Sequence, residues 1–538
     1  MVSKLRRTPL DTERLDIGNR RIHFPQRVGV SRHGMIATAH YRATEAGLEM
    51  LEDGGNAVDA AVAAAFALGV CEPAASGLGG QTMMLIHHAE SRRTFALDGS
   101  SRAPNRAVPN SLAKPQRRMG YQAMTVPSTP ACLRYALEQY GTRKLARLLE
   151  PAIRLAEQGY EITPLQHWLA RRELPLLKSG TAAPFLLNEG ERPFRPGAVF
   201  QQPVLADTLR RLAKKGVRDF YSGESAALIE QDMIRNGGLI RKDDLAQVPR
   251  PIERRPVAGH YQGQRVFTFP PPAAGRTLIE MVNVYEHLPP ARRNLDTPEG
   301  AVTLAEVIRR AFLDRQDRPY DPNFYSQVPS KRMLSVGHAK AVARQVLKRF
   351  RTAGETTHLS VMDRFGNAVA LTQSIENVYG ACVSTPELGF LYNNYMNAFD
   401  YADISHPHYM RPNAAPWASV APTIVFRGKR PWLVIGSPGS ERITPSIFQV
   451  LHRLQTHTPF AAVDAPRLHC SLNGTVSLEA ARMRDDIPAA LLRYGYQLDI
   501  RDPYSFYMGC VQLVMREGEE FIGVADPRRD GSARGPSR

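Results

Sequence analysis

A threonine pair stands where a basic segment gives way to a strand-like run. Residues 331–355 are rich in lysine and arginine, and residues 356–363 read TTHLSVMD. A threonine at a new N-terminus carries a hydroxyl nucleophile and a free α-amine on adjacent carbons, and the amine can act as general base. Thr356 is therefore a candidate nucleophile that exists only once the bond between Glu355 and Thr356 is cut. The alternative is that Thr356 merely begins a strand, since β-branched residues favour strands.

Several blocks along the chain resemble the gamma-glutamyltranspeptidase family. The small subunit of that family begins with Thr-Thr-His-x-Ser-Val-x-Asp-x-x-Gly-Asn-Ala-Val, and residues 356–369 fit this pattern. Further blocks follow in the family's order: residues 33–38 (HGMIAT), 43–47 (ATEAG), 54–63 (GGNAVDAAVA), 76–80 (SGLGG), 436–440 (GSPGS) and 525–528 (ADPR). The resemblance therefore covers nearly the whole chain.

The resemblance implies an α+β fold, a four-layer α-β-β-α sandwich of the N-terminal nucleophile hydrolase type. Two autoprocessed pieces would form this one large unit. Residues 1–355 would be a helix-rich large subunit, with residues 1–30 peripheral and about 331–355 a basic linker before the cut. Residues 356–538 would be a strand-rich small subunit that starts with the nucleophile. Periodicity by itself indicates only mixed α and β structure.

Local patterns predict individual elements. A helix is expected over residues 44–51, capped by Thr44 and stopped by two glycines, and an apolar, buried helix over residues 57–70. A strand is expected over residues 83–87. After Thr356 the pattern predicts strands over residues 359–362, 368–372, 389–392, 423–426 and 432–435.

Composition narrows the function classes. The 538 residues contain no run of about 18 uncharged apolar residues, so no membrane span is predicted. The N-terminal residues lack an apolar signal-peptide core, which favours a cytoplasmic protein. The five cysteines are scattered, without zinc-ligand spacing, so neither a metal nor another cofactor is predicted. The net charge of +17 is diffuse, which favours an acidic small substrate over nucleic acid.

The resemblance assigns catalytic roles to four residues. Thr356 would attack the carbonyl of Glu355 in the precursor and a substrate amide in the mature enzyme. Ser374 falls where the family has a second threonine that hydrogen-bonds the nucleophile. Gly439 and Ser440 occupy the positions of a Gly-Gly pair in the family, whose backbone N–H groups form an oxyanion hole. Serine at position 440 keeps its backbone N–H. The alternative for this last pair is an ordinary tight turn after a strand.

The positions that would bind the acyl donor depart from the family. Ser100 stands in the slot of an arginine for the donor's α-carboxylate, with Arg102 two residues later. The other departures are Glu376 for an asparagine, Tyr395 for a glutamine or glutamate, Ala398 for the aspartate that holds the α-amine, and Ala418-Ser419 for a Ser-Ser pair. Glu376 and Arg102 could hold the amine and carboxylate in a different geometry, or the acyl group is not an amino acid.

The expected function is thus a self-processing threonine amidohydrolase or acyltransferase. The leading donor class is γ-glutamyl, as in glutathione, with water or an amine as acceptor. The first alternative is an acylase acting on another amide, such as a dicarboxylic acyl side chain. A distant alternative is an uncut, inactive binding protein. The partners expected are the small-molecule amide and the two pieces of the same precursor, with no nucleic acid and no membrane.

Overall fold

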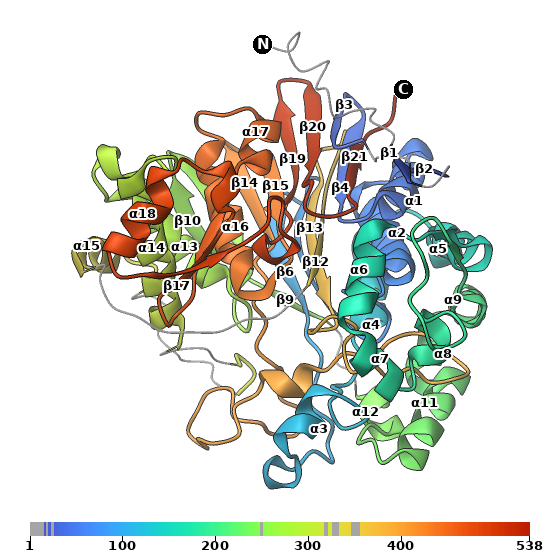
Figure 1. Cartoon of the computed structure of the whole chain (residues 1–538). Coiled ribbons are helices and arrows are strands. Elements are labelled where there is room, and N and C mark those ends of the chain that lie inside the picture. Colours follow the sequence, from blue (N-terminus) through green and yellow to red (C-terminus); the bar gives the residue numbers. More distant parts are fainter. Residues whose placement is uncertain are drawn as a thin grey trace.

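The centre of the molecule consists of two seven-stranded antiparallel sheets (Figure 1). This computed structural model describes residues 15–17, 20–22, 26–247, 251–316, 321–324, 333–345 and 356–537. Sheet I contains, in spatial order, β21 (Ser532–Arg534), β4 (Gly34–Thr38), β12 (Thr357–Asp363), β13 (Ala368–Ser374), β5 (Gln81–His88), β6 (Arg93–Gly99) and β9 (Ile252–Arg254). Sheet II contains β10 (Val257–Tyr261), β11 (Gln264–Thr268), β14 (Thr423–Arg427), β15 (Arg430–Gly436), β19 (Gln512–Glu517), β20 (Glu520–Ala525) and β3 (Val28–Ser31).

Both sheets mix strands from the two sides of Thr356. In sheet I the strand that follows Thr356, β12, lies between β13 and β4. In sheet II, β14 pairs with β11, and β20 pairs with β3. Pieces cut before Thr356 would therefore still share two continuous hydrogen-bonded sheets.

The alternation of side chains along β12 shows how the layers are stacked. Leu359 and Val361 belong to the apolar core that contains α1 (Tyr41–Glu52) and α2 (Ala57–Cys71). Met362, which points to the opposite face, belongs to the core that contains the strands of sheet II. Helices α13 (Gly275–Glu286) and α16 (Ile443–Arg453) cover the other face of sheet II. The order is helices, sheet, sheet, helices, and the α+β class is confirmed.

The remaining helices complete the two outer layers and a lower lobe in Figure 1. Beside α1 and α2 lie α4 (Thr129–Tyr140), α5 (Leu145–Gln158) and α9 (Pro203–Lys215). Beside α13 and α16 lie α14 (Pro298–Gln316), α15 (Val336–Gln345), α17 (Pro459–Asp464) and α18 (Asp486–Arg493). The other helices are α3 (Lys114–Arg118), α6 (Pro164–Arg172), α7 (Leu174–Ser179), α8 (Ala183–Leu186), α10 (Arg218–Ser222), α11 (Glu224–Arg235) and α12 (Lys242–Ala246).

Small sheets and 3-10 turns make up the rest of the regular structure. The small sheets are formed by β1 (Leu15–Ile17) with β2 (Arg20–Ile22), by β7 (Tyr160–Glu161) with β8 (Val199–Phe200), and by β16 (Leu468–Cys470), β17 (Thr475–Leu478) and β18 (Gln497–Ile500). The 3-10 turns are η3 (Pro109–Ser111), η4 (Pro290–Arg292), η5 (Tyr395–Ala398), η6 (Ser440–Arg442), η7 (Ala480–Arg482) and η8 (Phe506–Met508). Within the described residues, no helix combines the length and the apolar character that crossing a bilayer requires.

Two of the predicted elements need correction. The first helix begins at Tyr41 rather than Thr44, because the side chain of His40 caps it by accepting from the N–H of Arg42. Thr44 lies inside the helix, where its hydroxyl donates to the carbonyl of Ser532 at 3.0 Å. Residues 389–392 form only single-residue bridges instead of a strand, and Gly389 has a φ of +68°, which breaks an extended run.

Candidate active site

Thr356 lies immediately before β12 and is 2% exposed. The antiparallel register pairs Thr357 with Gln373, so the next position along places Thr356 opposite Ser374 at the end of β13. The carbonyl oxygen of Thr356 accepts a hydrogen bond of 3.1 Å from Nη1 of Arg529. Glu355 and the nine residues directly before it, 346–354, lie outside the described residues. The structure thus brings the expected nucleophile beside its expected hydroxyl partner.

A buried ion pair supports the start of β12 from the helix side. Nη1 of Arg529 also binds Oε1 of Glu72 at 2.9 Å, and Oγ1 of Thr357 donates to Oε2 of Glu72 at 2.5 Å. Glu72 is the residue that ends α2. Burial raises the pKa of Glu72, and the nearby charge of Arg529 opposes that rise. Arg529 and Glu72 therefore fix both residues of the threonine pair.

His358 lies between the two sheets, one residue after that pair. Its Nδ1 is 2.8 Å from the hydroxyl of Thr372, and its Nε2 is 3.1 Å from the hydroxyl of Ser360. Burial lowers the pKa of His358 to about 3, so the ring is neutral at physiological pH. A Cβ on Gly436 would come within 2.1–2.4 Å of the ring atoms. The glycine at the end of β15 thus allows sheet II to close onto β12.

The turn that follows β15 contains the two expected oxyanion-hole residues. Gly439 has a φ of +118° and Ser440 a φ of +52°, and both lie in the left-handed region. Ser440 is buried and begins η6. The turn is tied to the residues just before β19, the strand beside β15, because the N–H of Cys510 donates to Oγ of Ser437 at 3.0 Å. Since Gly436 packs on His358, this turn starts next to the segment that carries Thr356.

Polar contacts surround Ser374 in the expected donor region. The hydroxyl of Tyr395 bonds to Ser374, and Gln81 is the residue opposite Ser374 on β5. Oε1 of Gln81 accepts from the N–H and the hydroxyl of Ser101, at 2.9 and 3.1 Å. Burial raises the pKa of Tyr395, which keeps its hydroxyl protonated. Tyr395 is therefore a buried polar contact of Ser374.

Glu376 follows Ser374 by two residues. Its N–H donates to Oγ of Ser374 at 2.9 Å, and its φ of +76° is strained for a residue with a side chain. Burial raises the pKa of Glu376 to about 7. Tyr379 and Cys382, a few residues later, also have a positive φ, as does Ser440 in the turn after β15. Such strain concentrates at functional sites, where the surrounding structure holds it in place.

The charged group near Arg102 is the carboxylate of Asp321. Its backbone bridges Val126, and its side chain is buried. Burial raises the pKa of Asp321, and the nearby charge of Arg102 counteracts that rise. Ser100, in the slot of the family's arginine, turns its hydroxyl to Asp98 at 2.5 Å. Among the described residues, no hydrogen bond or ion pair joins Arg102 to Glu376.

The last two expected donor residues lie at the edges of this region. Ala398 ends η5, the turn that begins with Tyr395, and is partly exposed. Ser419 is also partly exposed and follows Ala418, whose N–H donates to the carbonyl of Pro272 at 3.2 Å. The contacts place neither residue against Thr356.

Arg529 and Glu72, which support the start of β12, were not predicted from the sequence. Arg529 follows the ADPR block directly, and Glu72 lies between two blocks that resemble the family, so their positions in the sequence could have indicated them. Within the block itself, Asp526 accepts from the N–H of Val511 at 2.8 Å and pairs with Arg467 and Arg528. These buried contacts anchor the C-terminal segment under β19.

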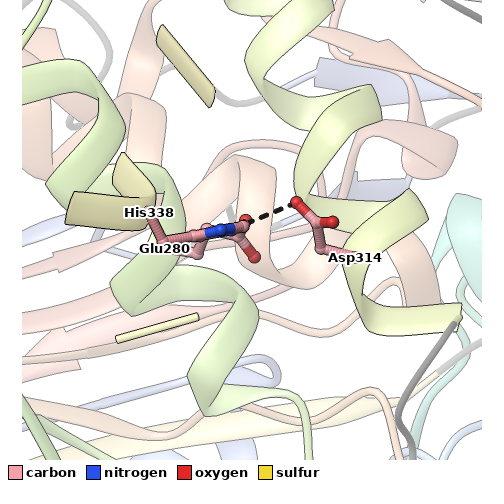
Figure 2. A group of neighbouring side chains, drawn as sticks. All are labelled: Glu280, Asp314 and His338. Carbon is pink, nitrogen blue, oxygen red and sulfur yellow. Dashed lines mark hydrogen bonds and ion pairs between the residues drawn. The ribbon is translucent and has the colours of Figure 1, made fainter. Parts of the chain in front are cut away.

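A second polar cluster lies outside the site (Figure 2). Nε2 of His338, on α15, is 2.8 Å from Oε1 of Glu280 on α13 and 3.3 Å from Oδ2 of Asp314 on α14. These residue types can bind a metal. Asp314 is already paired with Arg310 through both carboxylate oxygens, at 2.9 and 3.0 Å. Burial raises the pKa of Glu280 strongly. The cluster thus joins three helices by hydrogen bonds and ion pairs among its own side chains.

Known proteins share both the sequence pattern and this architecture. The sequence profile described as Gamma-glutamyltranspeptidase matches residues 43–535. The glutathione hydrolase proenzyme of Bacillus subtilis (strain 168) is 32% identical over 556 residues, which covers 95% of this chain and 92% of that protein. The acylase ACY 1 proenzyme of Pseudomonas sp. (strain V22) is 33% identical over 531 residues, which covers 93% of each.

A solved structure agrees over the whole length. The crystal structure of cephalosporin acylase from Bacillus halodurans matches with a TM-score of 0.87 and 28% identity, covering 97% of this chain and 99% of that chain. Sequence blocks, fold and overall length therefore lead to one assignment. The chain belongs to the gamma-glutamyltranspeptidase family and is an enzyme of the amide hydrolase and acyltransferase class.

Proposed function

We propose that the chain cuts itself before Thr356 and then uses this threonine as an acyl-transferring nucleophile. The observation that carries the proposal is the position of Thr356 at the start of β12, opposite Ser374 and with its carbonyl held by Arg529. Burial of the threonine excludes bulk water from the reacting bond. Relatives of comparable length are named as proenzymes, which supports processing.

In the precursor, the hydroxyl of Thr356 attacks the carbonyl carbon of Glu355. The peptide C–N bond breaks as the C–O bond forms, and the hydroxyl proton passes to the departing nitrogen. The result is an ester on Oγ1 and a free α-amine on Thr356. Water then hydrolyses the ester, which releases the carboxylate of Glu355 and restores the hydroxyl beside the new amine.

In the mature enzyme the α-amine takes the proton of the Thr356 hydroxyl as it attacks a substrate amide. The N–H groups at Gly439 and Ser440 stabilise the oxyanion, and such donors contribute a few kcal/mol each, roughly. The proton passes to the leaving amine when the C–N bond breaks, which leaves an acyl-enzyme ester. Water ends the cycle as hydrolysis, and a second amine ends it as transfer.

Glu376 favours a donor with an ammonium group, such as a γ-glutamyl amide. Burial is what raises the pKa of this carboxyl to about 7, so a bound cation would restore its charged form. Arg102 supplies the matching cation for the donor's α-carboxylate. A zwitterionic head group must find both partners, because an unpaired charge does not leave water readily.

A second candidate donor is a dicarboxylic acyl amide without the α-amine, such as a glutaryl amide. Ala398 offers no charge where the family holds the amine, and Arg102 alone could bind a terminal carboxylate. The similarity to the acylase ACY 1 proenzyme and to cephalosporin acylase supports this alternative. The chain is 33% identical to ACY 1 and 32% identical to the glutathione hydrolase proenzyme, so sequence identity supports the two donor classes equally.

The first test is a denaturing gel of the purified protein, followed by N-terminal sequencing of the smaller band. Fragments of residues 1–355 and 356–538 are expected to stay together without a disulfide. A chain that remains whole through long incubation at neutral pH would refute the proposal. The processed protein is then assayed with γ-glutamyl and glutaryl anilides.

The donor test compares Arg102→Ala and Glu376→Gln on both anilides. For a γ-glutamyl enzyme, each change is expected to raise KM by about one to two orders of magnitude, at roughly 1.4 kcal/mol per tenfold. Self-cleavage should be unaffected, because the precursor presents no free amino-acid head group. Turnover of the glutaryl anilide alone would assign the second donor class.

A further inference from the structure

A basic groove of about 920 Å³ opens between the two sheets, at the end of β12 that is remote from Thr356. Three hairpin turns contribute to it: residues 89–92 between β5 and β6, residues 364–367 between β12 and β13, and residues 428–429 between β14 and β15. The length of β12 separates the groove from Thr356 by roughly 20 Å, at about 3.3 Å per residue. The groove is therefore distinct from the candidate active site.

Buried rings and a turn-to-turn hydrogen bond give the basic groove a fixed shape. The ring of His87 on β5 lies edge-on to that of Phe426 on β14, with centroids 5.1 Å apart, and Phe426 also contacts Phe267 at 5.2 Å. Oδ1 of Asn367 accepts from the N–H of Ala89 at 2.8 Å, which joins two of the three turns. The cations on these turns are thus held around one concave surface before any ligand arrives.

Positive side chains dominate the lining. The cations that line the basic groove are Arg92, Arg265, Arg364, Lys429, Arg430 and Arg516. Asp363 is the one carboxylate among the described lining residues, and it is buried and accepts from backbone N–H groups of its own turn. Arg516 pairs with Glu519 at 3.8 Å. In the described part of the chain the other five cations have no ion-pair partner, and each is exposed.

The size and the borders of the basic groove favour a small anion over a nucleic-acid backbone. Its volume is that of a site for a small ligand. Glu90 and Glu519 lie on the turns beside it with highly exposed carboxylates, which would repel a polyanion that extends past the groove. Arginine forks match the oxygens of phosphate groups, and a lysine ammonium binds them as a point charge. A short chain of phosphates carries charge on every unit and can meet cations from several turns at once.

We propose that the basic groove binds a small polyphosphate, either the free inorganic chain or the triphosphate of a nucleotide. Arg92, Arg364 and Lys429 contact the phosphates, one from each turn. Because a surface lined by one sign of charge focuses its field on the opposite charge, binding is driven by electrostatic attraction. The inference does not depend on the proposed function, since the groove takes no part in the reaction at Thr356.

The test is a calorimetric titration of the purified protein, at low salt, with tripolyphosphate, orthophosphate and citrate. Tripolyphosphate is expected to bind at one site per chain, with a Kd lower than that of either reference anion by roughly tenfold, because several exposed ion pairs act together. The affinity should fall as sodium chloride is added, because exposed charges are screened. The titration needs no turnover, so it reads the groove whether or not the chain cuts itself.

The triple variant Arg92→Gln/Arg364→Gln/Lys429→Gln is expected to lose the preference for tripolyphosphate. Its matched control is Arg171→Gln/Arg192→Gln/Lys214→Gln, which lowers the net charge by the same amount at exposed positions that do not line the groove. A thermal-shift measurement compares each protein with itself. Tripolyphosphate should raise the Tm of the parent and of the control variant, because it binds the folded state, and should leave that of the groove variant unchanged.

Adenosine triphosphate distinguishes the two sources of the phosphate chain. Tighter binding of this nucleotide than of tripolyphosphate assigns the nucleotide, and equal or weaker binding assigns the inorganic chain. Equal affinity of the parent for tripolyphosphate and either reference anion would overturn the inference, as would equal losses in the two triple variants. Tighter binding of a single-stranded RNA, lost in the groove variant, would assign the surface to nucleic acid and overturn it as well.

Discussion

Arg529 holds the carbonyl oxygen of Thr356 at 3.1 Å and, with the same Nη1 atom, the carboxylate of Glu72 at 2.9 Å. The arginine lies near the C-terminus, and Glu72 ends a helix near the N-terminus. The bond that we expect to be cut is thus positioned by contacts between distant parts of the chain. Completion of the fold is therefore a condition for the cut.

Removal of Arg529 should slow self-cleavage and destabilise the protein. Arg529→Gln leaves Glu72 buried without its cation, which costs about 3–5 kcal/mol. The double variant Glu72→Gln/Arg529→Gln should recover much of that stability but still cut slowly. Urea unfolding in a Thr356→Ala background measures the first effect, and the rate at which fragments appear measures the second. A double variant that cuts at the parent's rate would contradict the positioning role.

Substitution of Thr356 should separate folding from cleavage. Thr356→Ala is expected to give a folded, uncut chain, because both attacks need the hydroxyl. Thr356→Ser should cut more slowly, since serine lacks the methyl group that restricts the threonine rotamer. Gel analysis over time distinguishes the three proteins. If the alanine variant still divides before residue 356, an external protease makes the cut.

The closeness of His358 to Gly436 predicts a severe packing defect in Gly436→Ala. The added methyl would lie 2.1–2.4 Å from the imidazole, and the ring is held by Thr372 and Ser360. Overpacking of this kind typically costs about 1–3 kcal/mol. Gly337→Ala is the control, because a Cβ there meets nothing within 4 Å. An unchanged Tm for Gly436→Ala would show that the two sheets can separate locally.

The pKa of Glu376 predicts a pH-dependent stability difference between parent and Glu376→Gln. Burial raises this pKa from 4.5 to about 7, so the folded state keeps a proton that the unfolded state releases in this range. The stability contributed is fully present below pH 4.5 and is lost as pH rises through 7. Relative to the parent, the glutamine variant should therefore gain stability between pH 4.5 and 8. Urea midpoints across that range measure the gain, and a constant difference would exclude the shift.

The cluster of Glu280, Asp314 and His338 predicts that chelators leave stability unchanged. Arg310 already neutralises Asp314, and the raised pKa of Glu280 favours its proton over a second charge. Treatment with EDTA followed by dialysis should not lower Tm, and added Zn²⁺ should not raise it. A Tm that falls with chelator and returns with zinc would establish a metal site, and a Glu280→Gln variant should then lose the effect.

The local sequence determined the elements that depend on short-range patterns. The apolar run at residues 57–70 became α2 almost to the residue, and the run after Thr356 became β12. The start of α1 was wrong because a histidine, rather than a threonine, supplies the cap. The strand expected over residues 389–392 was wrong because Gly389 has a positive φ and only Leu391 and Tyr392 form bridges, each with a single residue.

The sequence by itself determined which residue is the candidate nucleophile, because a threonine before a strand in a matching block is a local signal. Only the tertiary structure decided what surrounds it. Ser374 lies opposite Thr356 because of the register of β12 and β13, and Gln81 lies opposite Ser374 because β13 pairs with β5. Arg102 and Glu376 were both expected to bind the donor, but in the structure the two residues have different neighbours. Such contacts join segments up to 457 residues apart, as Arg529 and Glu72 show, and no local pattern encodes them.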